Sequence, residues 1–313
     1  MIVVAGEALI DLVPVDASAG GDLPALMPRR GGGPYNTAVA LGRLGSDVAF
    51  CSRLSTDHFG DALLRGLQAD RVDTRLIQRG DEPTTLAVAH VSDDGSADYT
   101  FYVVGSADRL FRMPDALPPQ TRAVSFGTCS LVLEPGASAY EELMRHEAAR
   151  GTFTVLDPNV RPGLIADADA YRARFHSWLP HVTLLKLSEE DAAWIAQSDD
   201  LRTAVKAWLA AGPAAVVLTR GSAGLAVLTR EGAEFAESGR RIEVVDTIGA
   251  GDTITAALLH RLDTHSALSA SGVGNLEAEE WHDVLGFAAL TAALTCSRPG
   301  AQPPYAAELA AHG

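Results

Sequence analysis

The sequence predicts an α/β fold in which helices cover both faces of a mostly parallel sheet. Short apolar runs alternate with amphipathic stretches through most of the 313 residues, and buried strands that alternate with helices are typical of such sheets. Hydrophobic residues make up 47% of the chain but aromatic residues only 6%. The core is therefore expected to consist mainly of Ala, Val and Leu, which suits helices packed on a sheet.

The expected elements follow one another in a regular order. Strands are expected at the apolar runs Ile2–Ala5, Val48–Ser52, Ala123–Phe126, Phe153–Leu156, Val182–Leu187, Ala215–Thr219 and Leu225–Thr229. Helices are expected at Asn36–Leu44, Phe59–Ala69, Ala139–Ala149, Ala170–Trp178 and Leu201–Ala210. Phe287–Cys296 is apolar but too short to cross a membrane, so it indicates a buried core helix.

One region departs from this alternation. Thr84–Val91 and Tyr99–Val104 are rich in β-formers and are joined by the turn-rich connector at residues 92–96. Such a hairpin could decorate an edge of the sheet, or it could project as a lid over a ligand, and the sequence favours neither. Because there is no internal repeat or charged linker, we expect one domain with an excursion rather than two independent domains.

Charge and cysteine content restrict the class of protein. A net charge of −15 disfavours nucleic acid and anionic membranes as partners, because both require a basic surface. Cys51, Cys129 and Cys296 lie far apart and form no CxxC pair, which indicates free thiols in the cytoplasm. Glu7 and Asp11 interrupt the apolar N-terminal run, so we expect a first strand there and no signal peptide.

The segment Val244–Asp252, with its sequence Asp-Thr-Ile-Gly-Ala-Gly-Asp, contains the strongest chemical signal. We expect a strand to end in the Gly-rich turn and a helix to begin at about Ala250. The first amides of a helix have no partner within it and can bind an anion. Asp252, in the first turn, is well placed to accept a proton from an alcohol that attacks a bound phosphoryl group.

Other interpretations of this segment are weaker. Asp252 could simply satisfy a helix N-terminus, but the complete pattern between a strand and an apolar helix favours function. The chain has no GxxxxGK[ST] motif, so it is not a P-loop enzyme. A GxGxxG motif does not follow the first strand, which disfavours a nicotinamide-dependent oxidoreductase.

A second glycine-rich motif lies near the N-terminus, at Gly31–Gly45. With both motifs in this order, the chain resembles the ribokinase-like (pfkB) carbohydrate kinase family over essentially its whole length. The resemblance implies a single domain over residues 1–313, a three-layer α/β/α arrangement, and a small β lid formed by segments of about 11–31 and 84–104. It also implies ATP and Mg²⁺, with K⁺ as an additional cation, and a lid that some relatives use to form homodimers.

The resemblance assigns roles to individual residues. Asp252 is the expected general base, and the amides of Gly249, Ala250 and Gly251 are the expected anion hole. Sugar contacts are expected from Asp11, Gly32, Gly33, Asn36 and Arg161. Nucleotide contacts are expected from Lys186, Ser188, Thr219, Gly221 and Gly224. Asp191 is expected to hold Mg²⁺ through water, and Asp246 a monovalent cation; Ser188 and Asp191 stand where the family has Asn and Glu.

Several short segments resemble the fructokinase-like branch of the family. They are Gly6–Asp11, Phe101–Tyr102 with Ala107–Leu110, Phe126–Leu131 and Asp157–Arg161. Together they make fructose, phosphorylated on its terminal hydroxyl, the first expected substrate. A 2-keto-3-deoxygluconate kinase, a ribokinase and a nucleoside kinase remain alternatives. A noncatalytic sugar-binding protein on the same fold is a different class, which the intact Gly249, Gly251 and Asp252 argue against.

Overall fold

The structure is a computed structural model of the chain and describes residues 1–15, 24–91 and 97–311. The strands of the main sheet are β1 (Ile2–Ala5), β4 (Val48–Ser55), β5 (Ile77–Gly80), β8 (Ala123–Gly127), β9 (Phe153–Asp157), β10 (Leu184–Ser188), β11 (Ala215–Thr219), β12 (Leu225–Thr229) and β13 (Glu234–Glu237). Within the described residues their order is β13-β12-β11-β10-β9-β8-β1-β4-β5. Neighbours from β5 to β11 pair in parallel, whereas β12 is antiparallel to both β11 and β13.

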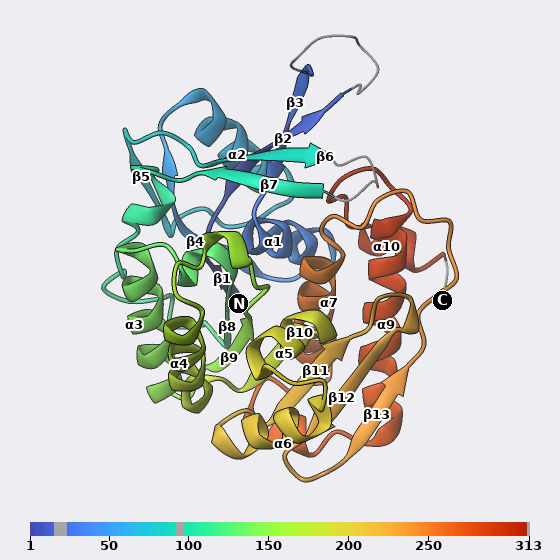
Figure 1. Cartoon of the computed structure of the whole chain (residues 1–313). Coiled ribbons are helices and arrows are strands. Elements are labelled where there is room, and N and C mark those ends of the chain that lie inside the picture. The colour runs from blue at the N-terminus through green and yellow to red at the C-terminus, as the bar shows by residue number, and fades with distance from the viewer. Residues whose placement is uncertain (16–23, 92–96, 312–313) are drawn as a thin grey trace.

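Helices cover both faces of this sheet (Figure 1). They are α1 (Gly33–Arg43), α2 (His58–Ala69), α3 (Gly136–Ala149), α4 (Ala168–Trp178), α5 (Glu189–Ala196), α6 (Leu201–Ala211), α7 (Ala250–Thr264), α8 (Ala270–Gly274), α9 (Ala278–Cys296) and α10 (Ala306–Leu309). Alternate residues of β1 face different cores: Ile2 packs with residues of α1, α7 and α9, and Val3 with residues of α3, α4 and α6. The predicted three-layer α/β/α fold is confirmed.

A second, smaller sheet lies beyond the end of the main sheet (Figure 1). It consists of β2 (Leu9–Pro14), β3 (Leu26–Gly31), β6 (Leu86–Val91) and β7 (Ala97–Tyr102), in the order β3-β2-β6-β7. The β6–β7 hairpin therefore does not decorate an edge of the main sheet, because β6 pairs in parallel with β2. The predicted connector at 92–96, and residues 16–23 of the first lid segment, lie outside the described residues.

Most expected elements are found within a few residues of their predicted bounds, but one expectation is wrong. Residues 244–246 do not form a strand. The amides of Val245 and Asp246 both donate to the carbonyl of Cys296, at 2.8 and 3.1 Å, and the Val245 side chain is 58% exposed. This apolar segment crosses the surface beside the end of α9 instead of pairing with a strand. No helix in the described ranges is long and apolar enough to span a membrane.

Candidate active site

The first turn of α7 places Asp252 at the centre of the site. The helix begins at Ala250, as expected, after Gly249 at φ +78°. That left-handed conformation favours glycine, and a Cβ on Gly249 would also lie only 2.6 Å from the Cβ of Ala301. The amides of Gly249 and Gly251 therefore stand at the positive end of the helix dipole, beside the Asp252 carboxylate. The Ala250 amide, also expected in the anion hole, donates instead to the Thr247 carbonyl at 3.2 Å.

Asp252 is joined to the N-terminal motif by hydrogen bonds. The side-chain amide of Asn36 donates to Oδ2 of Asp252 at 2.9 Å, and the Thr37 hydroxyl donates to the Asp252 carbonyl at 3.2 Å. Asn36 and Thr37 both lie on α1. The two glycine-rich motifs, far apart in the sequence, thus bring the N-termini of α1 and α7 together.

The approach of α1 to α7 depends on Gly33. A Cβ at this position would lie 2.6 Å from the hydroxyl oxygen of Thr128 and 3.2 Å from Oδ1 of Asp252. Any larger side chain would therefore displace the carboxylate or the loop after β8. Gly32 has φ +104°, and a Cβ on it would lie 2.8 Å from the carbonyl oxygen of Glu7.

Burial raises the pKa of Asp252 to about 6, with a smaller contribution in the same direction from the charge of Asp157. The hydrogen bond from Asn36 opposes this shift. Burial also raises the pKa of Asp11, on β2, to about 7, and the neighbouring charge of Asp252 adds to it. The two carboxyl groups differ in surroundings, since only Asp252 accepts the Asn36 amide.

A cavity of about 840 Å³ opens in front of Asp252, at the carboxyl ends of the parallel strands. Of the predicted site residues, it is lined by Asp11, Gly32, Gly33, Asn36, Arg161, Asp246, Gly249, Gly251 and Asp252. Tyr99 and Phe101 of β7 form part of its wall, so the second sheet borders the site. The Arg161 guanidinium donates to the side-chain oxygen of Asn159 at 2.7 Å and brings a positive charge to the cavity.

Behind Asp252 lies a buried ion pair. The Lys186 ammonium donates to Oδ2 of Asp157 at 2.7 Å, and the Thr255 hydroxyl donates to the same oxygen at 3.1 Å. Oδ1 of Asp157 is buried and has no hydrogen-bond partner among the described residues. A Cβ on Gly251 would lie 3.1 Å from Nζ of Lys186, so this glycine lets the ammonium approach the first turn of α7.

Ser188 and Asp191, the two departures from the family pattern, are structurally engaged. The Ser188 hydroxyl caps α5 by accepting from the Asp191 amide at 2.9 Å. Oδ1 of Asp191 accepts from the Val160 amide at 3.1 Å, which ties α5 to the loop after β9. Burial raises the pKa of Asp191. The adjacent Glu190, which the sequence analysis did not select, lines the cavity instead.

Asp246 joins the Gly-rich turn to the C-terminal loop. Its Oδ1 accepts from the Ile248 amide at 3.0 Å, and its Oδ2 accepts from the Gly300 amide at 2.7 Å. With Ala301 packed against Gly249, the loop at residues 299–302 supports the Gly-rich turn that was predicted to form the anion hole.

The three remaining predicted nucleotide contacts lie apart from this cavity. Thr219 ends β11 and is paired with Ser188 in the sheet register. Gly221 lies two residues further on, and a Cβ on it would have no neighbouring atom within 4 Å. Gly224 serves packing, because a Cβ there would lie 2.0 Å from the carbonyl oxygen of Glu237. Within the described residues, none of the three lines the cavity in front of Asp252.

Several residues that line the cavity were not predicted as site residues, namely Glu7, Thr128, Cys129, Asn159, Tyr99, Phe101 and Glu190. Glu7 accepts from the Ser130 amide at 2.9 Å, and burial raises its pKa to about 7. Its position just after β1 could have revealed it, since side chains after parallel strands meet at one edge. Tyr99 and Phe101 alternate along β7 with period 2, which was a second usable signal.

Comparison with known proteins decides the family. The sequence profile of the pfkB family carbohydrate kinases matches residues 1–308. The chain belongs to this family. The pfkB kinase is 36% identical over 281 residues to a fructokinase of Rhizobium leguminosarum bv. trifolii, covering 89% of this chain and 85% of the relative. It is 33% identical to a fructokinase of Klebsiella pneumoniae, with 84% of each chain covered.

A solved structure agrees with these sequence relatives. The fold of the kinase matches that of a fructokinase from Xylella fastidiosa with bound ATP at a TM-score of 0.90, with 27% identity and coverage of 99% and 97% of the two chains. These similarities confirm the expected pfkB family and its fructokinase-like branch.

Proposed function

We propose that this kinase transfers the γ-phosphate of ATP to the terminal hydroxyl of fructose and forms fructose 6-phosphate. The observation on which the proposal rests is a buried carboxylate, Asp252, at the N-terminus of α7 and at the floor of a polar cavity. The fructokinase relatives above 30% identity support the sugar. The ATP-bound Xylella fructokinase supports the phosphoryl donor.

In this mechanism Asp252 accepts the proton of the attacking hydroxyl, while Asn36 holds its carboxylate in position. A pKa of about 6 leaves Asp252 ionised at neutral pH, yet makes it a stronger base than an ordinary aspartate at 3.8. Asp11, Gly32 and Gly33 lie where the sugar would bind. The amides of Gly249–Gly251, together with Arg161, stabilise negative charge on the transferred group.

The residues present also fit the expected cations. Bound Mg²⁺ neutralises phosphate charge and typically needs only one or two protein carboxylates, the rest of its shell being phosphate and water. Asp191, Glu190 and the unpartnered Oδ1 of Asp157 are suitable donors near the cavity. We assign K⁺ to the turn at Asp246. Lys186, Ser188, Thr219, Gly221 and Gly224 remain the proposed nucleotide contacts, at the ends of β10 and β11.

We further propose that the second sheet is a lid, formed by segments of about 11–31 and 84–104, on a single domain of residues 1–313. Its inner wall holds Tyr99 and Phe101. Its edge strands expose Leu26, Met27 and Tyr102 by 39%, 44% and 61%, which supports a homodimer formed through the lid. We propose a cytoplasmic enzyme whose partners are a small sugar and ATP, and not nucleic acid or membrane.

Replacement of the base tests the proposal. Asp252→Asn should lower kcat by about 10³-fold, because general-base catalysis contributes roughly 10²–10⁴-fold, while fructose binding is largely retained. Asp263→Asn, near the other end of α7, is the control and should keep full activity. Full activity of the Asp252 variant would overturn the assignment of the base.

A coupled ADP-release assay identifies the substrate. It should use fructose, ribose, 2-keto-3-deoxygluconate, tagatose and nucleosides, and we expect the highest kcat/KM with fructose. A higher value with 2-keto-3-deoxygluconate, ribose or a nucleoside would select that alternative within the family. Absence of turnover with every sugar and nucleoside would favour a noncatalytic sugar-binding protein.

A further inference from the structure

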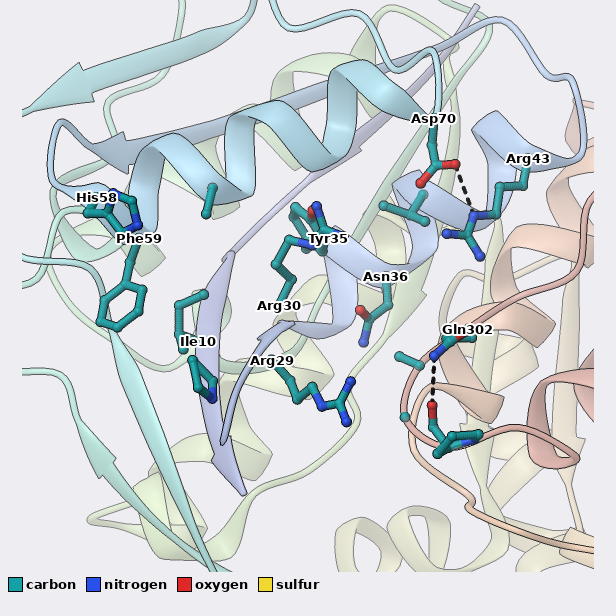
Figure 2. A pocket seen from close by; sticks show the side chains of 16 residues that line it. Ile10, Arg29, Arg30, Tyr35, Asn36, Arg43, His58, Phe59, Asp70 and Gln302 are labelled. Carbon is teal, nitrogen blue, oxygen red and sulfur yellow. Dashed lines mark hydrogen bonds and ion pairs between the residues drawn. The ribbon is translucent and has the colours of Figure 1, made fainter. Parts of the chain in front are cut away.

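A second cavity, of about 550 Å³, lies between β3, α1, α2 and the loop at residues 299–302 (Figure 2). Its lining is distinct from that of the catalytic cavity. Among the described residues, Asn36 alone lines both. The proposed mechanism gives this cleft no role.

The cleft is positively charged in a strongly acidic protein. Arg29, Arg30, Arg43 and His58 line it, and Asp70 is the one carboxylate among its described lining residues, in a chain of net charge −15. The Asp70 carboxylate is already engaged, since it accepts from Nε of Arg43 at 3.0 Å and from the Tyr305 hydroxyl at 2.9 Å. The local charge therefore favours an anion.

Two of these arginines are available to a ligand. The side chains of Arg29 and Arg30 are exposed, and neither side chain forms a hydrogen bond or ion pair with a described residue. Both line the cleft. In Figure 2 Arg30 lies next to Tyr35, and Arg29 lies below it, away from Tyr35. Arg30 is packed and not merely extended into solvent, because a Cβ on Gly66 of α2 would lie 2.5 Å from one of its guanidinium nitrogens. A glycine in α2 thus provides the space that the guanidinium occupies.

The remaining lining indicates a ligand with an organic body. Ile10, Val39, Phe59 and Ala62 supply an apolar wall next to the arginines. A volume of about 550 Å³ is typical of sites for small organic molecules and larger than a phosphate ion requires. Guanidinium groups bind phosphate with two parallel hydrogen bonds, which makes arginine the usual residue for such anions.

Two parts of the wall connect the cleft to the catalytic cavity. Asn36 donates to the Asp252 carboxylate. Gly300 and Ala301 hold Asp246 and Gly249, respectively, on the other side of the loop. A ligand bound against this wall therefore contacts residues that hold both Asp252 and the turn at Gly249 in position.

We propose that this cleft is a second binding site, for a small organic phosphate, and that its occupancy is coupled to the catalytic cavity. Arg30 is the central anion contact, with Arg29 and Arg43 on either side. The ligand differs from the phosphoryl donor of the reaction, because it binds on the opposite side of Asn36.

Calorimetric titration with inorganic phosphate and with glucose 6-phosphate tests the site. We expect two binding events in the wild-type protein. Arg30→Met should weaken one of them at least tenfold and leave the other, whereas Arg161→Met, in the catalytic cavity, should do the reverse. Arg202→Met, on α6 away from both cavities, is the control. A single event that Arg161→Met removes and Arg30→Met spares would overturn the proposal.

Kinetics and oligomeric state complete the test. Without added phosphate ester, Arg30→Met should keep the wild-type kcat and melting temperature, because the Arg30 side chain forms no hydrogen bond with a described residue. With glucose 6-phosphate, KM or kcat should change in the wild-type enzyme and not in the variant. Loss of basal kcat in Arg30→Met would instead place Arg30 in the catalytic machinery. A change of molecular mass in the variant, without ligand binding by the wild type, would mean that a second copy of the chain fills the cleft.

Discussion

The groups around the Asp252 carboxylate shift its pKa in opposite directions. Burial and the charge of Asp157 raise its pKa, while Asn36, Lys186 and Arg161 lower it. Asp157 is the instructive member of this set, because it does not contact Asp252 but keeps the Lys186 ammonium at 2.7 Å from itself. It thereby adds a negative charge near Asp252 and neutralises part of the effect of the Lys186 charge on the pKa of Asp252.

Asp157→Asn should therefore lower the pKa of Asp252. The rising limb of the pH profile of kcat/KM, expected near pH 6 in the wild type, should move to lower pH by about one unit. Thr255→Val is the matched control, since it removes a hydrogen bond to the same oxygen without changing charge. Profiles measured between pH 5 and 9 check this, and a shift of the limb to higher pH would contradict the electrostatic account.

At the scale of elements, one side chain connects α2 to the second sheet. Oδ1 of Asp57 caps α2 by accepting from the Gly60 amide at 2.7 Å, and also accepts from the Thr84 hydroxyl at 2.7 Å. Its Oδ2 accepts from the Thr84 amide at 2.9 Å. Thr84 lies just before β6. The Asp57 carboxylate therefore holds the start of β6 against α2, which also lines the second cavity.

Asp57→Ala should lower the free energy of unfolding by about 3 kcal/mol, because a helix cap and two further hydrogen bonds are lost together. Asp200→Ala removes the cap of α6, which is a single bond at 3.1 Å to the Thr203 amide, and should cost only about 1 kcal/mol. Urea unfolding followed by circular dichroism compares the two. Equal losses would show that the bonds to Thr84 contribute nothing.

Sequence patterns predicted the buried elements better than the exposed ones. The strand β1 is a continuous apolar run and β11 is apolar up to its last residue, so local composition reveals both. β3 is almost wholly exposed and has no apolar periodicity, so nothing in its sequence distinguishes it from a loop. At Val244–Val245 a strand was predicted where none forms. Two adjacent apolar residues on the surface resemble part of a strand, and the sequence does not show that they have no strand to pair with.

In the candidate site, too, some residues could be predicted from the sequence and others could not. Asp252 and Asn36 were predicted because they belong to long motifs. Whether Glu190 or Asp191 faces the cavity depends on how α5 is rotated, which the Ser188 cap and the Val160 amide fix. The bond to Val160 joins α5 to the loop after β9, and a contact between such distant segments cannot be predicted from residue spacing alone.

For the whole molecule, several buried carboxyl groups make stability depend on pH. Burial raises the pKa of Glu7 from 4.5 to about 7, and it raises those of Asp11 and Asp252 as well. The folded state thus binds protons more tightly than the unfolded chain does. The corresponding stabilisation is fully present below the unfolded-state pKa values and is lost as pH rises through about 7.

Glu7→Gln should make this dependence shallower. Between pH 4.5 and 7.5 the wild type should lose more unfolding free energy than the variant, by about 2–3 kcal/mol, since one pKa unit corresponds to about 1.4 kcal/mol. Chemical unfolding at several pH values measures the difference. Glu142→Gln, at an exposed position of α3, is the control and should show the wild-type dependence of stability on pH. If Glu7→Gln showed that same dependence, Glu7 would not be one of its causes.

The hydrogen bond between Asn36 and Asp252 has a consequence for biosynthesis. Its two partners are 216 residues apart, so at roughly 5–20 residues per second the ribosome delivers the second about 10–40 s after the first. During that interval a nascent chain contains Asn36 but not its hydrogen-bond partner Asp252. The proposed role of Asp252 as the base therefore predicts that fragments that end before this residue have no kinase activity.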